Sequence, residues 1–251
     1  MSKQDLVTII TPSYNSKKFV SETIDSVLKQ TYKNFEMIIV DDCSSDNSAE
    51  YIQSILPDSR FKIVKLSKNV GAAEARNVAL RLATGKFIAF LDSDDKWHPD
   101  KLRIQIDFMM KYNIAFSYTS YELINEQGLS QNKVISSKPL TNFNGYMKNT
   151  IIGCLTVVID RQKLKYFEMP NLKSSHDMAL WGDIMLSNNI SAYGLDKSLS
   201  SYRLVTNSNT ANKLKAAKDV WFVYRRHFNM SLLTSCWYFV NYAFNATIKR
   251  I

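Results

Sequence analysis

The sequence predicts an α/β domain whose central sheet is mostly parallel and flanked by helices. Across residues 1–95, short apolar runs of strand length alternate three times with segments whose apolar residues recur at helical spacing. Such alternation is typical of β-α-β units joined by right-handed crossovers. Several of the apolar runs end in polar and acidic residues. In a parallel sheet these would gather at the edge where ligands bind.

Length and composition are those of one globular domain. The chain has 251 residues, of which 45% are hydrophobic and 22% charged, enough for a single domain with a full core. Its three cysteines, Cys43, Cys154 and Cys236, are far apart and form no C-x-x-C pair, which argues against a disulfide framework or a zinc site. This cysteine usage, and an N-terminus without the apolar run of a signal peptide, predict a cytoplasmic protein.

Four strands and three helices are expected in the first half of the chain. The strands cover residues 6–10, 35–40, 61–66 and 87–91. Asn15 or Ser16 would cap the first of the helices that lie between them. The third helix covers residues 72–83 with Leu82 on its inner face, and Gly85 suits its C-terminal cap.

The second half follows a looser pattern. Pro99 suits the first turn of a fourth helix, and the polar residues 125–150 are expected to be irregular. Strands are expected at residues 114–119 and 151–160 and, as two short strands, within 190–203. Another helix is expected to begin near His176. Without repeats or a linker, residues 1–205 are predicted to form one domain.

Polar groups follow four strand-like segments. These groups are Thr11–Asn15, Asp41–Asp42, Asn69–Arg76 and Asp92–Asp95. Because parallel strands end at the same edge of a sheet, the four segments would form one cleft. The carboxylates of Asp92, Asp94 and Asp95 repel one another unless a cation lies among them, which indicates a divalent metal with a phosphate as co-ligand. A solvated acidic turn before the next helix is the alternative interpretation.

The cleft suits a nucleotide diphosphate, and other nucleotide-binding motifs are absent from the sequence. No G-x-G-x-x-G follows the first strand, and no G-x-x-x-x-G-K-[ST] occurs, which disfavours dinucleotide binding and P-loop hydrolysis. A G-x-S-x-G nucleophile elbow is also missing.

Five segments, in this order and spacing, resemble the family 2 glycosyltransferases. They are Val7–Asn15, Ser26–Tyr32, Glu36–Asp46, Asn69–Asn77 and Phe90–Asp95. The resemblance implies the GT-A fold, a nucleotide-sugar donor, expected to be UDP-linked, and inversion of the anomeric configuration. It also implies that residues 1–110 bind the nucleotide sugar and residues 111–205 bind the acceptor.

The resemblance assigns roles to individual residues of the first half. Those expected to line the uridine are Pro12, Ser13, Tyr14 and Asp42, with Arg76 nearby. Asp92 and Asp94 would be the D-x-D pair that touches the ribose and a Mn²⁺ or Mg²⁺ ion. Asp95 is a further candidate metal ligand.

Two segments of the second half resemble the family more weakly. Residues 175–181 are similar to its E-D-x-x-L-W segment, which would make Asp177 the catalytic base, although His176 replaces the usual glutamate. Without the resemblance, Asp177 reads as an acid favoured at a helix N-terminus. Residues 201–205 are similar to the family's Y-R-x-H segment, so Arg203 is a candidate for the pyrophosphate, while Val205 stands where histidine is common.

The C-terminal segment, residues 206–251, is expected to be helical and to associate with a membrane. From Arg203 onward, eight Lys and Arg residues face one acid, Asp219, a net charge of +7. Phe228–Ile248 contains no charged residue but many aromatic ones, which favours a helix lying on an anionic membrane surface. A helix packed on the domain and a transmembrane span are the alternatives.

Together these observations predict an inverting, metal-dependent glycosyltransferase of bacterial surface polysaccharide synthesis, of the O-antigen or capsule type. The donor would be a UDP-hexose or UDP-N-acetylhexosamine, and the acceptor a saccharide on polyprenyl diphosphate at the inner face of the inner membrane. A basic nucleic-acid-binding domain is one alternative, but acidic strand ends would repel its ligand. A nucleotidyltransferase is another, but the basic glycine-rich loop that it needs does not follow the first strand.

Overall fold

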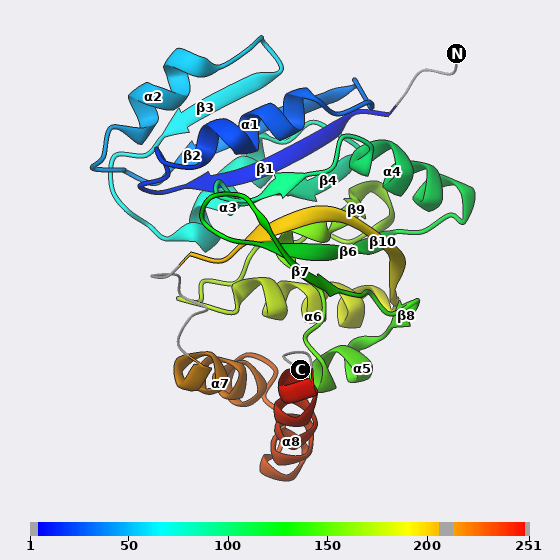
Figure 1. The fold of residues 1–251 in the computed structure, drawn as a ribbon. Helices are drawn as coiled ribbons and strands as arrows, with labels where there is room; N and C mark the ends of the chain where they lie inside the picture. The colour runs from blue at the N-terminus through cyan, green and yellow to red at the C-terminus, as the bar shows by residue number, and fades with distance from the viewer. Residues whose placement is uncertain (1–4, 206–212, 249–251) are drawn as a thin grey trace.

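A mixed ten-stranded sheet forms the centre of the molecule (Figure 1). The computed structural model describes residues 5–205 and 213–248. The strand order is β3-β2-β1-β4-β9-β6-β10-β5, with β7 paired to β6 and β8 paired to β10. The predicted α/β class is therefore confirmed, and it places both halves of the chain on one continuous sheet.

The first half is the parallel part of the sheet. Its strands are β1 (Val7–Ser13), β2 (Phe35–Asp41), β3 (Phe61–Lys65) and β4 (Phe87–Phe90), and its helices are α1 (Val20–Leu28), α2 (Ser48–Ile55) and α3 (Ala72–Leu82). β1 pairs in parallel with both β2 and β4. Side chains alternate between the faces of β1, so that Ile9 joins the core beneath α1 and Ile10 joins the core beneath α3.

The second half adds both parallel and antiparallel strands. Its strands are β5 (Lys96–Trp97), β6 (Phe116–Ile124), β7 (Ser130–Ile135), β8 (Leu140–Thr141), β9 (Val158–Asp160) and β10 (Ala192–Arg203). Its helices are α4 (Lys101–Lys111), α5 (Phe143–Lys148) and α6 (His176–Asn188). β9 runs antiparallel between β4 and β6, and β10 runs parallel to β6. Helices α1, α2 and α4 cover one face, and α3 and α6 cover the other.

Two predicted helix caps in the first half are wrong. Helix α1 begins only at Val20, and the side-chain oxygens expected to cap it are engaged elsewhere: Asn15 Oδ1 accepts the backbone N–H of Ser45, and Ser16 Oγ is hydrogen-bonded to Ser13 Oγ. Helix α3 ends before Ala83, which is extended, and Leu82 is half exposed rather than inward. Gly85 has a different function, since a Cβ there would lie 2.6 Å from the backbone nitrogen of Thr8 on β1.

Other boundaries also differ from the expectation. Helix α4 begins after Asp100, so Pro99 lies outside its first turn. Only the last three residues of the expected strand 151–160 form a strand, because residues 154–156 form the 3₁₀ turn η1. Within residues 190–203 the structure has one long strand, Ala192–Arg203, with register shifts, instead of two short ones. The stretch 125–150 contains β7, β8 and α5, which the polar sequence concealed because β7 is an exposed edge strand.

The C-terminal segment packs on the domain as helices α7 (Lys213–Phe222) and α8 (Leu232–Ile248), joined by the π-helical turn η3 (Val223–His227). These helices form the end of the molecule opposite α2 and β3 (Figure 1). Val223 and Tyr224 belong to the same apolar cluster as Trp181 of α6. Within the described parts of the chain, no helix has the length and hydropathy that a membrane crossing needs.

Candidate active site

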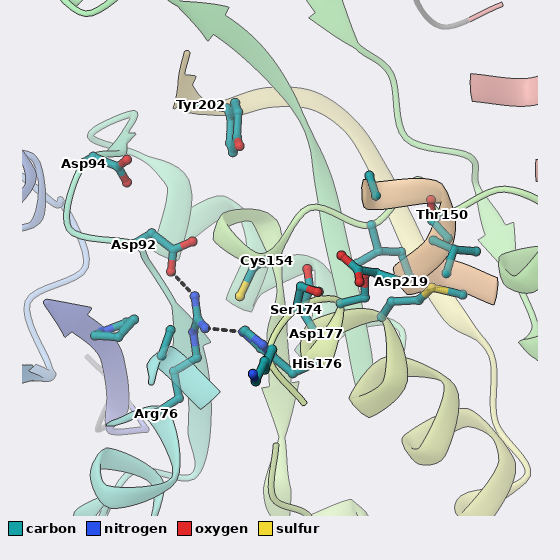
Figure 2. A pocket seen from close by; sticks show the side chains of 18 of the residues that line it. Arg76, Asp92, Asp94, Thr150, Cys154, Ser174, His176, Asp177, Tyr202 and Asp219 are labelled. Carbon is teal, nitrogen blue, oxygen red and sulfur yellow. Dashed lines mark hydrogen bonds and ion pairs between the residues drawn. The ribbon is translucent and has the colours of Figure 1, made fainter. Parts of the chain in front are cut away.

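A cavity of about 620 Å³ opens where the parallel strands end, and it collects most of the predicted site residues. Those that line it are Pro12, Ser13, Tyr14, Asp42, Arg76, Asp92, Asp94 and Asp177. Figure 2 shows Asp92 and Asp94 at one end, with Arg76 and His176 between them and Asp177. Two predicted residues, Asp95 and Arg203, are not among the residues that line the cavity.

Asp42 is held rigidly at the end of β2. Its carboxylate accepts hydrogen bonds from the backbone N–H groups of Val70, at 2.7 Å, and Gly71, at 2.8 Å. Gly71 has φ +89, a backbone conformation that favours glycine, so the loop before α3 can wrap around the acid. The remaining lone pairs of this carboxylate can accept from a base or ribose. Tyr14 lies nearby with 54% of its surface exposed, which leaves its ring available for stacking.

Arg76 connects the two ends of the site. Its guanidinium is almost completely buried, forms an ion pair with Asp92 through Nη2, and lies 2.7 Å from His176 Nε2 through Nη1 (Figure 2). Burial, together with the charge of Arg76, lowers the pKa of His176. The ring is therefore neutral at neutral pH and accepts the hydrogen bond at Nε2. The residue that replaces the family's glutamate thus holds Arg76 without adding a negative charge.

Asp92 and Asp94 are the carboxylates that could hold a cation. Burial, and then the negative charge of Asp92, raises the pKa of Asp94 to about 6. A cation between the two acids would remove that repulsion, so the donor set fits a divalent metal. Among the described residues no group of three or more Asp, Glu, His or Cys side chains is arranged as a metal site. Further ligands would therefore have to come from a bound phosphate or water.

Asp95 does not join this pair. Its side chain is buried, and Oδ1 accepts the backbone N–H of Arg203 at 2.8 Å. Burial and the charges of Asp94 and Asp92 raise the pKa of Asp95 well above its usual value. The structure therefore places this candidate ligand behind the D-x-D turn and outside the cavity.

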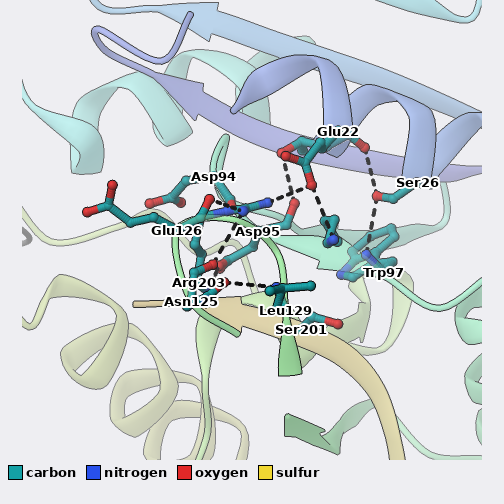
Figure 3. A network of polar contacts seen from close by, with 12 residues as sticks. Glu22, Ser26, Asp94, Asp95, Trp97, Asn125, Glu126, Leu129, Ser201 and Arg203 are labelled. Carbon is teal, nitrogen blue, oxygen red and sulfur yellow. Dashed lines mark hydrogen bonds and ion pairs between the residues drawn. The ribbon is translucent and has the colours of Figure 1, made fainter. Parts of the chain in front are cut away.

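Arg203 also lies outside the cavity, at the centre of a polar network (Figure 3). Its side chain is fully buried. Nε donates to the carbonyl of Asp94 at 2.7 Å, Nη1 to the carbonyl of Glu126 at 2.8 Å, and Nη2 to the carboxylate of Glu22 at 3.0 Å. With its donors engaged, Arg203 holds the turn that carries Asp94. The contact of Arg203 with a pyrophosphate stays a prediction.

Asp177 stands in the first turn of α6 and lines the cavity. Four residues later, Trp181 is completely buried and packs edge-on against Phe90, with the ring centroids 5.2 Å apart. This packing fixes the start of α6 against the end of β4, which carries the D-x-D turn. Asp177 is thus both an acid at a helix N-terminus and a carboxylate that faces the cavity, so the two interpretations of the sequence are compatible.

Several cavity residues were missed by the sequence reasoning. They are Tyr146, Thr150, Cys154, Tyr202, Asp219 and Tyr242. Most come from the loop after α5 and from helices α7 and α8, and no strand end marks those positions. One feature of the sequence marks Asp219: it is the single acid in a basic segment. Figure 2 places it with Thr150 at the end of the cavity away from Asp92 and Asp94.

Two solved structures share this fold. TarS from S. aureus in complex with UDP-GlcNAc matches with a TM-score of 0.70 at 24% identity, covering 88% of this chain and 65% of that longer one. The mannosyltransferase PcManGT from Pyrobaculum calidifontis, in complex with GDP-Man and Mn²⁺, also has a TM-score of 0.70, at 18% identity over 92% of this chain and 66% of that one. The GT-A fold implied by the resemblance is therefore confirmed.

Sequence comparison identifies much closer relatives. The putative teichuronic acid biosynthesis glycosyltransferase TuaG of Bacillus subtilis is 46% identical over 98% of both chains. The UDP-Glc:alpha-D-GlcNAc-diphosphoundecaprenol beta-1,3-glucosyltransferase WfgD of Escherichia coli is 44% identical over 94% of this chain and 92% of its own. The model of glycosyl transferase family 2 matches residues 8–167, more than half of the chain. The protein is a glycosyltransferase and belongs to glycosyl transferase family 2.

Proposed function

We propose that the protein transfers a sugar, with inversion, from a UDP-linked donor to a saccharide carried on polyprenyl diphosphate, in bacterial surface polysaccharide synthesis. The proposal rests on one observation: Asp92 and Asp94 line one end of a cavity, and Asp177 lines the same cavity further along. A donor diphosphate and an acceptor hydroxyl can then meet in one space. The name of the relative WfgD gives UDP-Glc as donor and a GlcNAc-diphosphoundecaprenol as acceptor, which supports these substrate classes, and the name of TuaG gives teichuronic acid biosynthesis.

The donor end would bind the nucleotide through residues of β1 and β2. Asp42 accepts from the uracil N–H or a ribose hydroxyl, and the exposed ring of Tyr14 stacks on the base. Pro12 and Ser13 complete this wall of the cavity. Asp92 and Asp94 would hold Mn²⁺ or Mg²⁺, which supplies positive charge to the diphosphate oxygens as they leave.

Asp177 would act as the general base. It takes the proton from an acceptor hydroxyl, and the hydroxyl oxygen forms a bond to the anomeric carbon while the bond from that carbon to the diphosphate breaks. UDP leaves with the electron pair, and one in-line displacement inverts the anomeric centre. Arg76, held by His176, contributes positive charge beside Asp92 at the leaving-group side.

The proposed acceptor places the enzyme at the inner face of the bacterial membrane. Ala216, Val220 and Tyr242 of α7 and α8 line the same cavity as Asp177, so the C-terminal segment borders the acceptor space. A lipid-linked acceptor would reach the site past these helices. The alternative of nucleic-acid binding receives no support from this cavity, whose acidic walls would repel phosphate in the absence of a cation.

A donor screen tests the proposal. Thermal-shift and UDP-release assays with a panel of nucleotide sugars should single out a UDP-sugar, and UDP release should require a polyprenyl-diphosphate saccharide acceptor. EDTA should abolish release, and added Mn²⁺ or Mg²⁺ should restore it. Asp94→Asn should behave like the EDTA-treated enzyme, with the exposed Asp25→Asn as its matched control. Full activity in EDTA would remove the metal from the proposal.

A further inference from the structure

Helix α8 has two apolar faces, and the described parts of the chain cover only one of them. On the inner face Tyr238 donates to Asn144 at 2.7 Å, and Phe239 packs on Trp221 with ring centroids 5.5 Å apart. Nearer the C-terminal end, Asn245 donates to the carbonyl of Lys148 at 3.1 Å. These contacts fix α8 on α5 and α7, and they determine which face points outward.

The outward face carries an apolar stripe. Leu233, Trp237, Val240 and Phe244 are 84%, 60%, 65% and 66% exposed. Their spacing of four, three and four residues places them on one side of the helix. Leu232, 58% exposed, extends the stripe at its start. Helix α8 contains no charged residue at all, whereas a helix face that meets water normally carries charged and polar side chains.

A basic side chain borders this stripe, since Lys148 Nζ lies 5.7 Å from the centre of the Trp237 ring. Lys218 and Arg226 are further exposed basic side chains, on α7 and η3. The single acid of the segment, Asp219, lines the cavity. An apolar stripe with a tryptophan and a cationic border suits the boundary between the headgroups and acyl chains of an anionic bilayer. A second copy of the chain suits it less, because two such basic surfaces would repel each other.

We infer that the outer stripe of α8, Leu233, Trp237, Val240 and Phe244, inserts into an anionic lipid surface while Lys148, Lys218 and Arg226 contact its phosphate groups. The inference rests on the proposed function for its purpose, a lipid-linked acceptor. Tyr242 lies on the same helix and lines the cavity, so docking of α8 brings the acceptor end of the cavity to the headgroup level. The helix lies along the membrane surface and does not cross it.

Vesicle binding of the full chain tests this inference in the absence of donor and acceptor. The wild type should sediment with phosphatidylcholine vesicles that contain about one quarter phosphatidylglycerol, and much less with phosphatidylcholine alone. The double variant Trp237→Gln/Phe244→Gln should lose about tenfold or more of its partitioning. The matched control Leu129→Gln, at a residue 64% exposed on the β6–β7 connection, should bind as the wild type does.

Two further measurements show whether a loss of vesicle binding comes from the stripe itself or from a damaged fold. UDP binding by the double variant should equal that of the wild type, which shows that the fold and the cavity are retained. In the intact protein, brominated lipids should quench a fluorescence component that disappears in Trp237→Phe, a conservative change that retains an aromatic ring.

Other outcomes would contradict either the inference or the proposed function. Wild-type protein that ignores anionic vesicles, or a dimer that separates on Trp237→Gln/Phe244→Gln substitution, would overturn the inference. Vesicle binding without transfer from any UDP-sugar would leave the docking surface intact and contradict the proposed function instead.

Discussion

At the scale of single residues, His176 distinguishes this chain from the family pattern that it resembles. The side chain keeps Arg76 beside Asp92 through a hydrogen bond from the guanidinium to Nε2, at 2.7 Å. Glutamate at this position would compete with Asp92 for Arg76 as a second anion. A neutral acceptor leaves the ion pair between Arg76 and Asp92 intact and adds no repulsion near Asp94.

Substitutions at His176 should separate the effect of its hydrogen bond to Arg76 from the effect of its side-chain volume. His176→Gln retains an acceptor and should keep kcat/KM for the donor within a few-fold, whereas His176→Leu should lower it by about 10- to 100-fold, the cost of a hydrogen bond to a charged group. Steady-state kinetics with varied donor would measure both. Equal loss in the two variants would show that Nε2 does not position Arg76.

Arg203 gives a second prediction at this scale. Arg203→Met leaves the carbonyls of Asp94 and Glu126 and the carboxylate of Glu22 without their partner, so the free energy of unfolding should fall by about 3 to 5 kcal/mol. Lys18→Met breaks an exposed pair with Glu126 and should cost less than about 1 kcal/mol. Denaturant unfolding measures both. A variant of normal stability with a raised KM for the donor would instead support the pyrophosphate contact.

At the scale of elements, Glu36 joins four parts of the sheet. Its carboxylate accepts from Thr8 on β1, from Lys62 on β3, and from both the backbone N–H and the hydroxyl of Thr84 before β4. Burial alone would raise the pKa of Glu36, but these hydrogen bonds outweigh it and lower the pKa to about 2. One ionised side chain thus adds hydrogen bonds that link β1, β2, β3 and the segment just before β4.

This lowered pKa predicts acid sensitivity. The stabilisation is fully present above the usual pKa of 4.5 and is lost as the pH falls toward about 2. The shift corresponds to about 3 kcal/mol of the free energy of unfolding. Glu36→Gln should therefore be less stable at neutral pH and show a flatter decline between pH 4.5 and 2. Urea titrations at several pH values measure this, and identical slopes for the two proteins would contradict it.

The elements differ in how well the sequence predicts them. The strands β1, β2 and β4 are fully buried, whereas the edge strand β3 is only partly buried. The residues at the ends of these strands gather as expected because parallel strands share one edge. The exposed edge strand β7 and the short β8 carry no such pattern, so residues 125–150 looked irregular. Helix α6 begins at His176, as expected, and its Leu180, Trp181 and Ile184 are all buried.

The residues of the candidate site also differ in how well the sequence predicts them. Asp92, Asp94 and Asp177 were predicted from motifs and all line the cavity. Arg203 does not line the cavity, and a motif alone does not show which face of a strand a residue occupies. Its neighbour Tyr202 lines the cavity, as strand alternation requires. Asp219 was missed because tertiary packing of the C-terminal helices, rather than local sequence, brings it to the acceptor end.

At the scale of the whole molecule, the proposed donor and acceptor sites lie at the two ends of one cavity. The proposed donor end lies over β1 and β2, the D-x-D turn follows β4, Asp177 lies in the first turn of α6, and residues of α7 and α8 border the proposed acceptor end. Helix α8 also carries the outer stripe proposed to meet the membrane. Nucleotide from solution and acceptor from the bilayer would thus approach the cavity from opposite ends.

The role of Asp177 as the general base is the central claim, and Asp177→Asn tests it most directly. The variant keeps the size and helix position of the side chain, so UDP-sugar affinity measured by calorimetry should stay within about twofold of the wild type. Loss of the base should lower sugar transfer to the acceptor by at least about a hundredfold. Transfer by Asp177→Asn at a rate close to that of the wild type would contradict the account.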